Sequence, residues 1–319
     1  MRAGHLFGTV PLREWYNRES MAWNGRHFLN LAELSCGDMI GLMKRASNFL
    51  DAGDRYEPNA PLTGKIIANL FMENSTRTRC SFTIATKRLG GDYIDLLVET
   101  SSTSKGETLV DTALNLEAMG VAGIVVRCSQ ENGPSEIAEN VGIPVINAGS
   151  GTSAHPTQAL LDAVTLTRYF GTDDLLGQHI AIVGDITHSR VARSNVIGLT
   201  KLGATVTLVG PSELLPNDLG CKTSTDFDGV LSTVSAVMML RVQFERDAQV
   251  GEDYHEKFGL TEQRFANFHG AVLHPGPMNR GLEIDDNVAN PESSPHNLIL
   301  SQVTSGVATR MAILEHLIG

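Results

Sequence analysis

The five consecutive residues Ser75–Arg79 (STRTR) combine three hydroxyl groups with two guanidinium groups. They follow the strand-like run Lys65–Phe71 and precede apolar residues at helical spacing, so Ser75 is expected to be a helix N-cap. The next three residues then fall in the first turn, where unpaired backbone N–H groups and the helix dipole favour phosphate. Arg77 could add a bidentate contact to the phosphate oxygens. The pattern predicts an anion site; the alternative is a simple cap with solvent-exposed arginines, and Arg79 could be a structural ion-pair partner.

The charge of the whole chain makes this local concentration of arginine more informative. The chain has 36 Asp and Glu against 25 Lys and Arg, which gives a formal net charge of −11. Such acidity opposes nucleic-acid binding through a broad basic face, but it does not oppose a small anion held by a few converging arginines. We therefore expect no nucleic-acid partner.

Four polar loops besides 72–79 also follow predicted strands and contain arginine. They are 127–132, 184–190, 241–246 and 274–281. In open parallel sheets, ligands bind at the carboxyl ends of the strands, so we expect all five loops to surround one site. Arg190 at a predicted helix start suits a carboxylate. Two prolines fix the shape of the last loop, and the Gly276-Pro277 bond could be cis.

His155-Pro-Thr-Gln158 precedes another predicted helix. A neutral imidazole beside a side-chain amide could polarise a carbonyl group and hold an NH2 group. A lone histidine is more often structural, so this interpretation depends on its neighbours. The polar loop 100–107 is, from its composition alone, most simply a solvated loop.

Strand and helix signals alternate in two series, the second starting near residue 178. The expected strands are 65–71, 93–97, 123–127, 144–147, 179–184, 204–210, 236–240 and 270–273. This alternation predicts an α/β protein with two doubly wound parallel-sheet domains, each sheet covered by helices on both faces. The length of 319 residues suits two such domains. An amphipathic helix containing Val303, Val307, Met311 and Leu314 is expected to end the chain.

Several classes of protein fit the sequence poorly. The apolar runs are too short to span a membrane and the N-terminus has no secretory core, so a cytoplasmic location is expected. The cysteines Cys36, Cys80, Cys128 and Cys221 are far apart, which disfavours a disulfide framework or a zinc site built on paired cysteines. Glycine-rich dinucleotide and Walker patterns are absent, so a nucleotide-binding module at 180–210 is the weaker alternative. A non-catalytic assembly scaffold is the third hypothesis.

From about Arg26 to the C-terminus, the chain resembles the aspartate/ornithine carbamoyltransferase family. The motifs that carry the resemblance are Ser75-Thr-Arg-Thr-Arg79, Ser101…Lys105-Gly-Glu, His155-Pro-Thr-Gln158, Arg241-Val-Gln243 and His274-Pro-Gly-Pro277. The last two are similar to the aspartate branch, and the His-Cys-Leu-Pro and Ser-Met-Gly signatures of ornithine enzymes are absent. The resemblance implies carbamoyl transfer from carbamoyl phosphate to L-aspartate in pyrimidine biosynthesis, without a metal, coenzyme or protein nucleophile.

The resemblance also implies roles for individual residues. Those expected to bind carbamoyl phosphate are Ser75, Thr76, Arg77, Thr78, Arg127, His155 and Gln158, together with Ser101 and Lys105 from a neighbouring subunit. Those expected to bind aspartate are Lys105, Arg190, Arg241, Gln243, Gly276 and Pro277. Catalytic contributions are implied for Arg77, Thr78, Arg127, His155 and Lys105. Gly276 stands where many members have leucine, but its backbone carbonyl could still contact the attacking amine.

The family resemblance further implies a domain plan and an assembly. Residues 1–26 would be an N-terminal extension, 27–156 a carbamoyl phosphate-binding domain, and 157–303 an aspartate-binding domain. The C-terminal helix, 304–319, would cross back to the first domain. Sharing of Ser101 and Lys105 between subunits implies a homotrimer. Family members also pair with zinc-containing regulatory chains or with dihydroorotase-like chains, and the N-terminal extension together with the HPGPMNR loop favours the latter.

Overall fold

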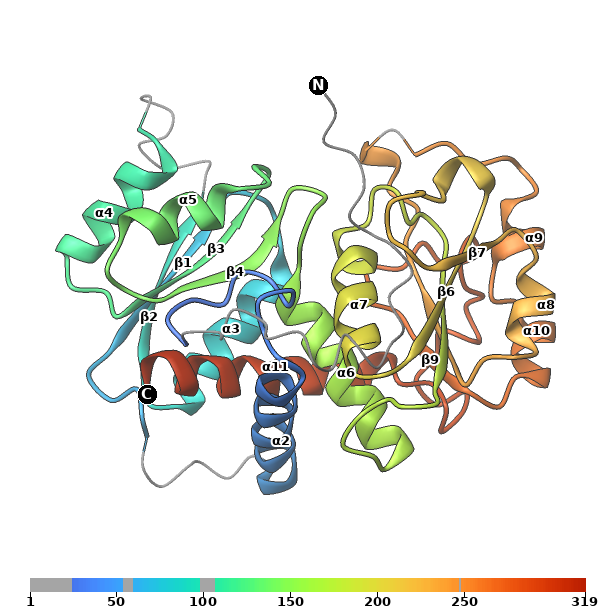
Figure 1. Ribbon diagram of the computed structural model, residues 1–319, viewed down its shortest axis with the longest axis horizontal. Helices are drawn as coiled ribbons and strands as arrows, with labels where there is room; N and C mark the ends of the chain where they lie inside the picture. Colours follow the sequence, from blue (N-terminus) through green and yellow to red (C-terminus); the bar gives the residue numbers. More distant parts are fainter. Residues whose placement is uncertain (1–24, 54–59, 98–106, 247) are drawn as a thin grey trace.

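The protein is described by a computed structural model that covers residues 25–53, 60–97, 107–246 and 248–319. Two α/β units lie side by side, and two long helices, α6 (Pro156–Phe170) and α11 (Ile299–Ile318), lie between or beneath them (Figure 1). No helix within these ranges is long and apolar enough to cross a membrane. The four cysteines Cys36, Cys80, Cys128 and Cys221 are free.

The first unit is built on a four-stranded parallel sheet in the order β2-β1-β3-β4. Its strands are β1 (Ile66–Phe71), β2 (Asp92–Leu97), β3 (Gly123–Cys128) and β4 (Val145–Ser150), and its helices are α2 (Cys36–Ala52), α3 (Thr76–Arg88), α4 (Leu109–Ala118) and α5 (Gly133–Asn140). Adjacent residues of a strand point to opposite faces. Ile67 therefore packs in the cluster that contains Phe82 of α3, whereas Ala68 packs with Leu116 of α4 and Ile137 of α5.

The second unit has a five-stranded parallel sheet in the order β7-β6-β5-β8-β9. Its strands are β5 (His179–Val183), β6 (Thr205–Val209), β7 (Lys222–Ser224), β8 (Ala236–Met239) and β9 (Ala271–Leu273), and its further helices are α7 (Arg190–Lys201), α8 (Phe227–Leu231), α9 (Tyr254–Phe258) and α10 (Glu262–Asn267), with 3₁₀ turns η3 (Ser212–Leu214) and η4 (Phe244–Arg246). Ile182 of β5 faces α6 and α7, and Val183 faces α8 and α9. The predicted pair of doubly wound parallel sheets is confirmed.

The last helix returns to the first unit, as predicted. Helix α11 packs against α2, α3 and α6, and it also touches β9 of the second sheet (Figure 1). One apolar cluster therefore runs from Ile67 of the first sheet through Ile313 of α11 to Ile182 of the second. Arg45 of α2 forms an ion pair with Glu315 of α11 at 2.5 Å. The two units thus share part of a core, which holds their strand ends in a fixed relation.

Local signals in the sequence account for several element boundaries. Ser35 caps α2 through a reciprocal capping box with Asp38, as its spacing predicts. Four elements of the second unit, β7, α8, α9 and α10, were not predicted. Strand β7 is only three residues long and is mostly exposed, so it carries no run of buried apolar residues that a sequence pattern could reveal.

Candidate active site

The carboxyl ends of the two sheets open into one cavity of about 960 Å³ between the units. All five predicted loops line it, which confirms that they surround one site. The lining residues include Glu73–Thr78, Arg127, Ser189, Arg190, Arg241, Gln243, Glu245, Arg246, His274–Met278 and Arg280. His155 and Gln158, from the start of α6, lie on the wall between the loops of the two units. The parallel topology brings these segments together because every strand delivers its following loop to the same edge.

The STRTR segment forms the N-terminus of α3 at one side of this cavity. Ser75 is the N-cap residue, as predicted, but its side chain makes no capping hydrogen bond. The first turn contains no acidic residue to offset the helix dipole. Burial lowers the pKa of Arg77, and the nearby Arg241 of the second unit lowers it further. An anion at this helix end would satisfy the N–H groups and relieve the crowding of positive charge.

Arg77 also packs closely against the loop that follows β9. A Cβ atom on Gly276 would lie 3.1 Å from Cζ of Arg77, and Gly276 has a φ of +62°. Both facts favour glycine here, because another side chain would need the left-handed conformation and would displace the guanidinium. The Gly276-Pro277 bond is cis. The N–H of Gly276 donates to Nδ1 of the buried His274 at 2.8 Å, which fixes the start of the loop.

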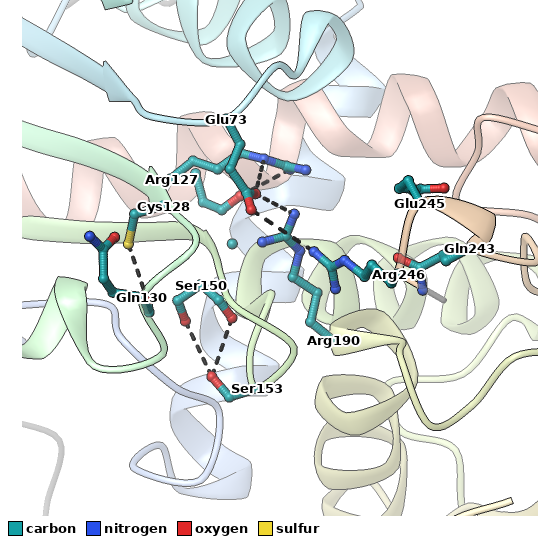
Figure 2. Close-up of polar contacts among 12 residues, drawn as sticks. Glu73, Arg127, Cys128, Gln130, Ser150, Ser153, Arg190, Gln243, Glu245 and Arg246 are labelled. Carbon is teal, nitrogen blue, oxygen red and sulfur yellow. Dashed lines mark hydrogen bonds and ion pairs between the residues drawn. The ribbon is translucent and has the colours of Figure 1, made fainter. Parts of the chain in front are cut away.

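Glu73 is the centre of an arginine cluster that the sequence analysis did not identify. Its Oε2 accepts a hydrogen bond from Arg190 Nη2 at 2.7 Å and lies 3.4 Å from Arg127 Nε, and its Oε1 lies 4.0 Å from Arg246 Nη2. Figure 2 shows the three guanidinium groups converging on this one carboxylate from loops of both units. Glu73 adjoins the STRTR segment at the end of β1, which is the only signal in the sequence that could have found it.

The arginine cluster holds more donors than Glu73 can accept. Arg127 Nε and Arg190 Nη1 are buried and have no hydrogen-bond partner among the described residues. Burial, together with the neighbouring Arg190, lowers the pKa of Arg127 to about 9, although Glu73 partly opposes the shift. Buried donors are nearly always paired in folded proteins. These two nitrogens make no hydrogen bond among the described residues and can donate to an anionic ligand with several oxygens.

His155 occupies a buried position beside these arginines. Burial and the positive charges of Arg127 and Arg190 hold its pKa well below the usual range, so its imidazole is neutral at neutral pH. Its backbone N–H donates to Oγ of Ser194 on α7 at 2.8 Å, which joins the start of α6 to the second unit. A neutral imidazole retains one N–H group, which can donate a hydrogen bond to a carbonyl oxygen.

The loops after β5 and β8 hold two further arginines for anions. Arg190 is 7% exposed and pairs with Glu73, while Arg241 pairs with Glu245 of its own loop. Gln243 Nε2 donates to the backbone carbonyl of His188 at 2.9 Å, which ties the two loops together. Both arginines thus already bind carboxylates of this chain, and the same geometry suits the carboxylates of a ligand.

The remaining predicted residues have different outcomes. Arg79 lies 4.0 Å from Asp95 of β2 and is a structural ion-pair partner, as expected. Ser101 and Lys105 lie outside the described residues. Within the described ranges, no group of three or more His, Cys, Asp or Glu side chains could hold a metal ion. The arrangement as a whole is suited to positioning anions and stabilising negative charge that develops between them.

Comparison with known proteins adds a family to this geometry. The domain described as "Aspartate/ornithine carbamoyltransferase, carbamoyl-P binding domain" matches residues 26–168, and the one described as "Asp/Orn binding domain" of the same family matches residues 176–317. The aspartate carbamoyltransferase catalytic subunit of Acidothermus cellulolyticus is 48% identical over 304 residues, covering 92% of this chain and 93% of that protein. The subunit from Xanthomonas campestris is 47% identical over 308 residues, covering 92% and 96%.

Solved structures give the same result at lower identity. Aspartate transcarbamoylase from Trypanosoma cruzi, in complex with carbamoyl phosphate and aspartate, aligns with a TM-score of 0.84 at 29% identity, covering 92% of this chain and 97% of that one. The catalytic subunit of the M. jannaschii enzyme aligns with a TM-score of 0.81 at 31% identity, covering 92% and 98%.

Proposed function

This chain belongs to the aspartate/ornithine carbamoyltransferase family, and from that premise we propose that it is an aspartate carbamoyltransferase of pyrimidine biosynthesis. It transfers the carbamoyl group of carbamoyl phosphate to the amino group of L-aspartate, giving N-carbamoyl-L-aspartate and phosphate. The observation that carries this proposal is the convergence of arginines from both units on one cavity, with buried guanidinium nitrogens left unpaired. The substrates are an acyl phosphate and a dicarboxylate, whose oxygens match those donors in kind.

The first unit supplies the carbamoyl phosphate side. The phosphate binds at the N-terminus of α3, to Ser75, Thr76, Arg77 and Thr78. Arg127 and His155 donate to the carbonyl oxygen of the carbamoyl group, and Gln158 accepts from its NH2 group. Support comes from the cavity, which all of these residues line. By resemblance to the family, Ser101 and Lys105 of a neighbouring subunit complete this side.

The second unit supplies the aspartate side. Arg190, Arg241 and Gln243 bind its two carboxylates, in place of the carboxylates of Glu73 and Glu245 that the arginines contact here. The loop containing Gly276 and Pro277 closes over the attacking amine, and a neighbouring Lys105 also reaches the aspartate. This division assigns 27–156 with 304–319 to carbamoyl phosphate and 157–303 to aspartate, with Gln158 at the boundary between them contributing to the carbamoyl side.

The chemistry follows from these placements. The uncharged amino group of aspartate attacks the carbamoyl carbon, and the carbonyl oxygen becomes an oxyanion. Hydrogen bonds from neutral His155, from Arg127 and from Thr78 stabilise that negative charge as it forms. The C–O bond to phosphate then breaks, and the departing phosphate takes the proton of the amine. Most of the rate enhancement comes from holding two mutually repelling anions in contact, which is why the site is rich in arginine.

The assembly and location of the protein follow the family. We infer a homotrimer in the cytoplasm, with each active site completed by Ser101 and Lys105 of the next subunit. A dihydroorotase-like chain is the partner favoured for a larger assembly. The N-terminal extension, residues 1–26, is the feature that favours it over a regulatory chain. Co-purification from native lysate tests this: a zinc-containing regulatory chain in the complex contradicts the inference.

The direct test measures phosphate released from carbamoyl phosphate. Release should require L-aspartate and should not occur with ornithine or putrescine. Arg77→Ala should lower kcat/KM for carbamoyl phosphate by about 100-fold, because it removes a charged bidentate contact of about 3 kcal/mol. The matched control is Arg79→Ala, two residues along the same helix, whose guanidinium pairs with Asp95 and should leave the rate within about threefold. Activity with another amine, or a wild-type rate in the Arg77 variant, would overturn the proposal.

A further inference from the structure

A buried carboxylate surrounded by three amides lies behind the cavity, and of this group only Gln158 has a part in the mechanism above. Asp162 of α6 is fully buried. Its Oδ1 accepts hydrogen bonds from Gln158 Nε2 at 2.9 Å and from Gln302 Nε2 at 2.8 Å, and its Oδ2 accepts from Asn195 Nδ2 at 2.8 Å. The donors come from α6, α11 and α7. The positive charge of the buried Arg310, also on α11, favours the ionised form of this carboxylate.

The carboxylate determines which way the Gln158 amide points. An ionised carboxylate oxygen can only accept hydrogen bonds, so the Gln158 atom at 2.9 Å from it must be the NH2 nitrogen. The carbonyl oxygen of the amide is then at the other end. Gln158 lines the cavity, and none of the hydrogen bonds among the described residues uses that oxygen. The atom left for a ligand is therefore an acceptor and not a donor.

The same carboxylate oxygen orients a second amide. Because Gln302 Nε2 donates to Asp162 Oδ1, its own carbonyl oxygen points the other way and accepts from the backbone N–H of His274 at 2.8 Å. His274 begins the loop that contains Gly276 and Pro277. One buried anion thus sets an amide on the carbamoyl side of the cavity and supports a loop on the other side.

We propose that Asp162 is a positioning residue that fixes the amide of Gln158 with its oxygen toward the cavity and thereby selects an acyl phosphate that carries an NH2 group. The inference rests on the proposed function, since that NH2 group belongs to carbamoyl phosphate. Acetyl phosphate has a methyl group in the same place and cannot donate a hydrogen bond. Asp162 acts only through Gln158 and does not touch the substrate.

The experiment compares the two acyl phosphates in the whole enzyme. Asp162→Leu keeps the side-chain size but removes both acceptor oxygens, so the Gln158 amide is free to turn. We expect kcat/KM for carbamoyl phosphate to fall by about 10- to 100-fold, while the inhibition constant of acetyl phosphate changes by less than about threefold. The readout is the selectivity for carbamoyl phosphate over acetyl phosphate, which is the affinity for acetyl phosphate (the inverse of its inhibition constant) divided into kcat/KM for carbamoyl phosphate. We call this quantity the ratio. It is used because removal of a negative charge would strengthen the binding of both phosphates alike.

The control variant is Asn195→Leu. It removes the donor to Oδ2 and disturbs the same buried cluster, but it leaves the bond between Gln158 and Oδ1. Its ratio should equal that of the wild type. If the ratio falls in both variants, or in neither, Asp162 has only a structural role. In a Gln158→Leu background, Asp162→Leu should change the ratio no further, and an additional loss would also refute the proposal.

A second substitution tests the same role if the Asp162→Leu variant folds poorly. Asp162→Asn keeps the shape and one acceptor oxygen, which three amide donors must then share, so we expect a smaller fall in the ratio, about 3- to 10-fold. An unchanged ratio in this variant overturns the inference. If the wild-type enzyme releases phosphate with aspartate but the variants keep its selectivity, only the role of Asp162 is wrong. If the wild type itself is inactive, the proposed function fails first.

Discussion

Replacing Asp162 with asparagine should change how the stability of the protein depends on pH. Burial raises the pKa of Asp162 to about 6, from an ordinary value of 3.8, and the three amide donors and Arg310 only partly oppose that shift. The folded protein therefore holds this proton more tightly than the unfolded chain does. Between about pH 4 and pH 6 the folded state binds more protons, so its stability falls as the pH rises.

The size of the effect follows from the two pKa values. They differ by roughly 2 units, and each unit corresponds to about 1.4 kcal/mol. Ionised Asp162 should therefore lower the free energy of unfolding by about 3 kcal/mol above pH 6, relative to its neutral acid. A typical domain has only about 5–15 kcal/mol of stability, so this is a measurable share. Asparagine cannot ionise, and the variant should lack this dependence.

Urea denaturation of both proteins at one protein concentration, from about pH 4 to pH 7, measures the effect. The stability of the wild type minus that of the variant cancels the other titrating groups. It should fall by about 2.4 kcal/mol across this range, since the unfolded carboxyl is already partly ionised at pH 4. Asp228→Asn is the control: Arg264 lowers the pKa of Asp228, so that difference should stay constant above about pH 4. A constant difference for the Asp162 variant would show that ionisation of this carboxyl does not destabilise the folded state, and would refute the reasoning.

Three further predictions concern single contacts. Lys201→Met should lower the free energy of unfolding by about 2 kcal/mol, because the Lys201 ammonium donates to three backbone carbonyls of 31–34; urea denaturation tests this, with the exposed Lys44→Met as a control expected to lose less than about 1 kcal/mol. Ser35→Ala should lower it by about 1 kcal/mol by removing the α2 cap, and an unchanged thermal midpoint would contradict this. His155 should stay neutral, so its NMR signals should not titrate between about pH 6 and pH 8; a midpoint in that interval would contradict the effect of burial.

The fold was largely predictable because its strands are buried on both faces. Runs such as Ile180–Val183 are continuous and apolar, and helical spacing follows several of them, a pattern typical of parallel α/β sheets. Two edge strands are largely exposed, β2 over residues 92–96 and β7, and of these the strand that was not predicted is the three-residue Lys222–Ser224. Its pairing with β6 depends on position in the sheet and not on its own residues.

The site was predictable in part for a similar reason. The rule that loops gather at the carboxyl ends of strands identified the five segments without knowing their contacts. Glu73 was missed because its importance depends on Arg190, 117 residues away in sequence, which no local pattern reveals. Asp162 was missed because a single acidic residue in a helical pattern is usually solvent-exposed, whereas α6 is buried nearly all round between the two units.

The arginine cluster and Asp162 show the same kind of departure from ordinary protein interiors. The pKa of Arg127 is lowered to about 9 and that of Asp162 is raised to about 6, so burial disfavours the charged form of both. Both nevertheless remain charged at neutral pH. Under the proposed function, an anionic substrate would supply hydrogen-bond acceptors to the arginine and relieve this unfavourable state when it binds. Asp162 is fully buried, and under the proposal above its charge orients the amides of Gln158 and Gln302. Binding an anion and orienting an amide both require a buried charge, although burial disfavours the charged form. Groups with shifted pKa values therefore gather at functional sites.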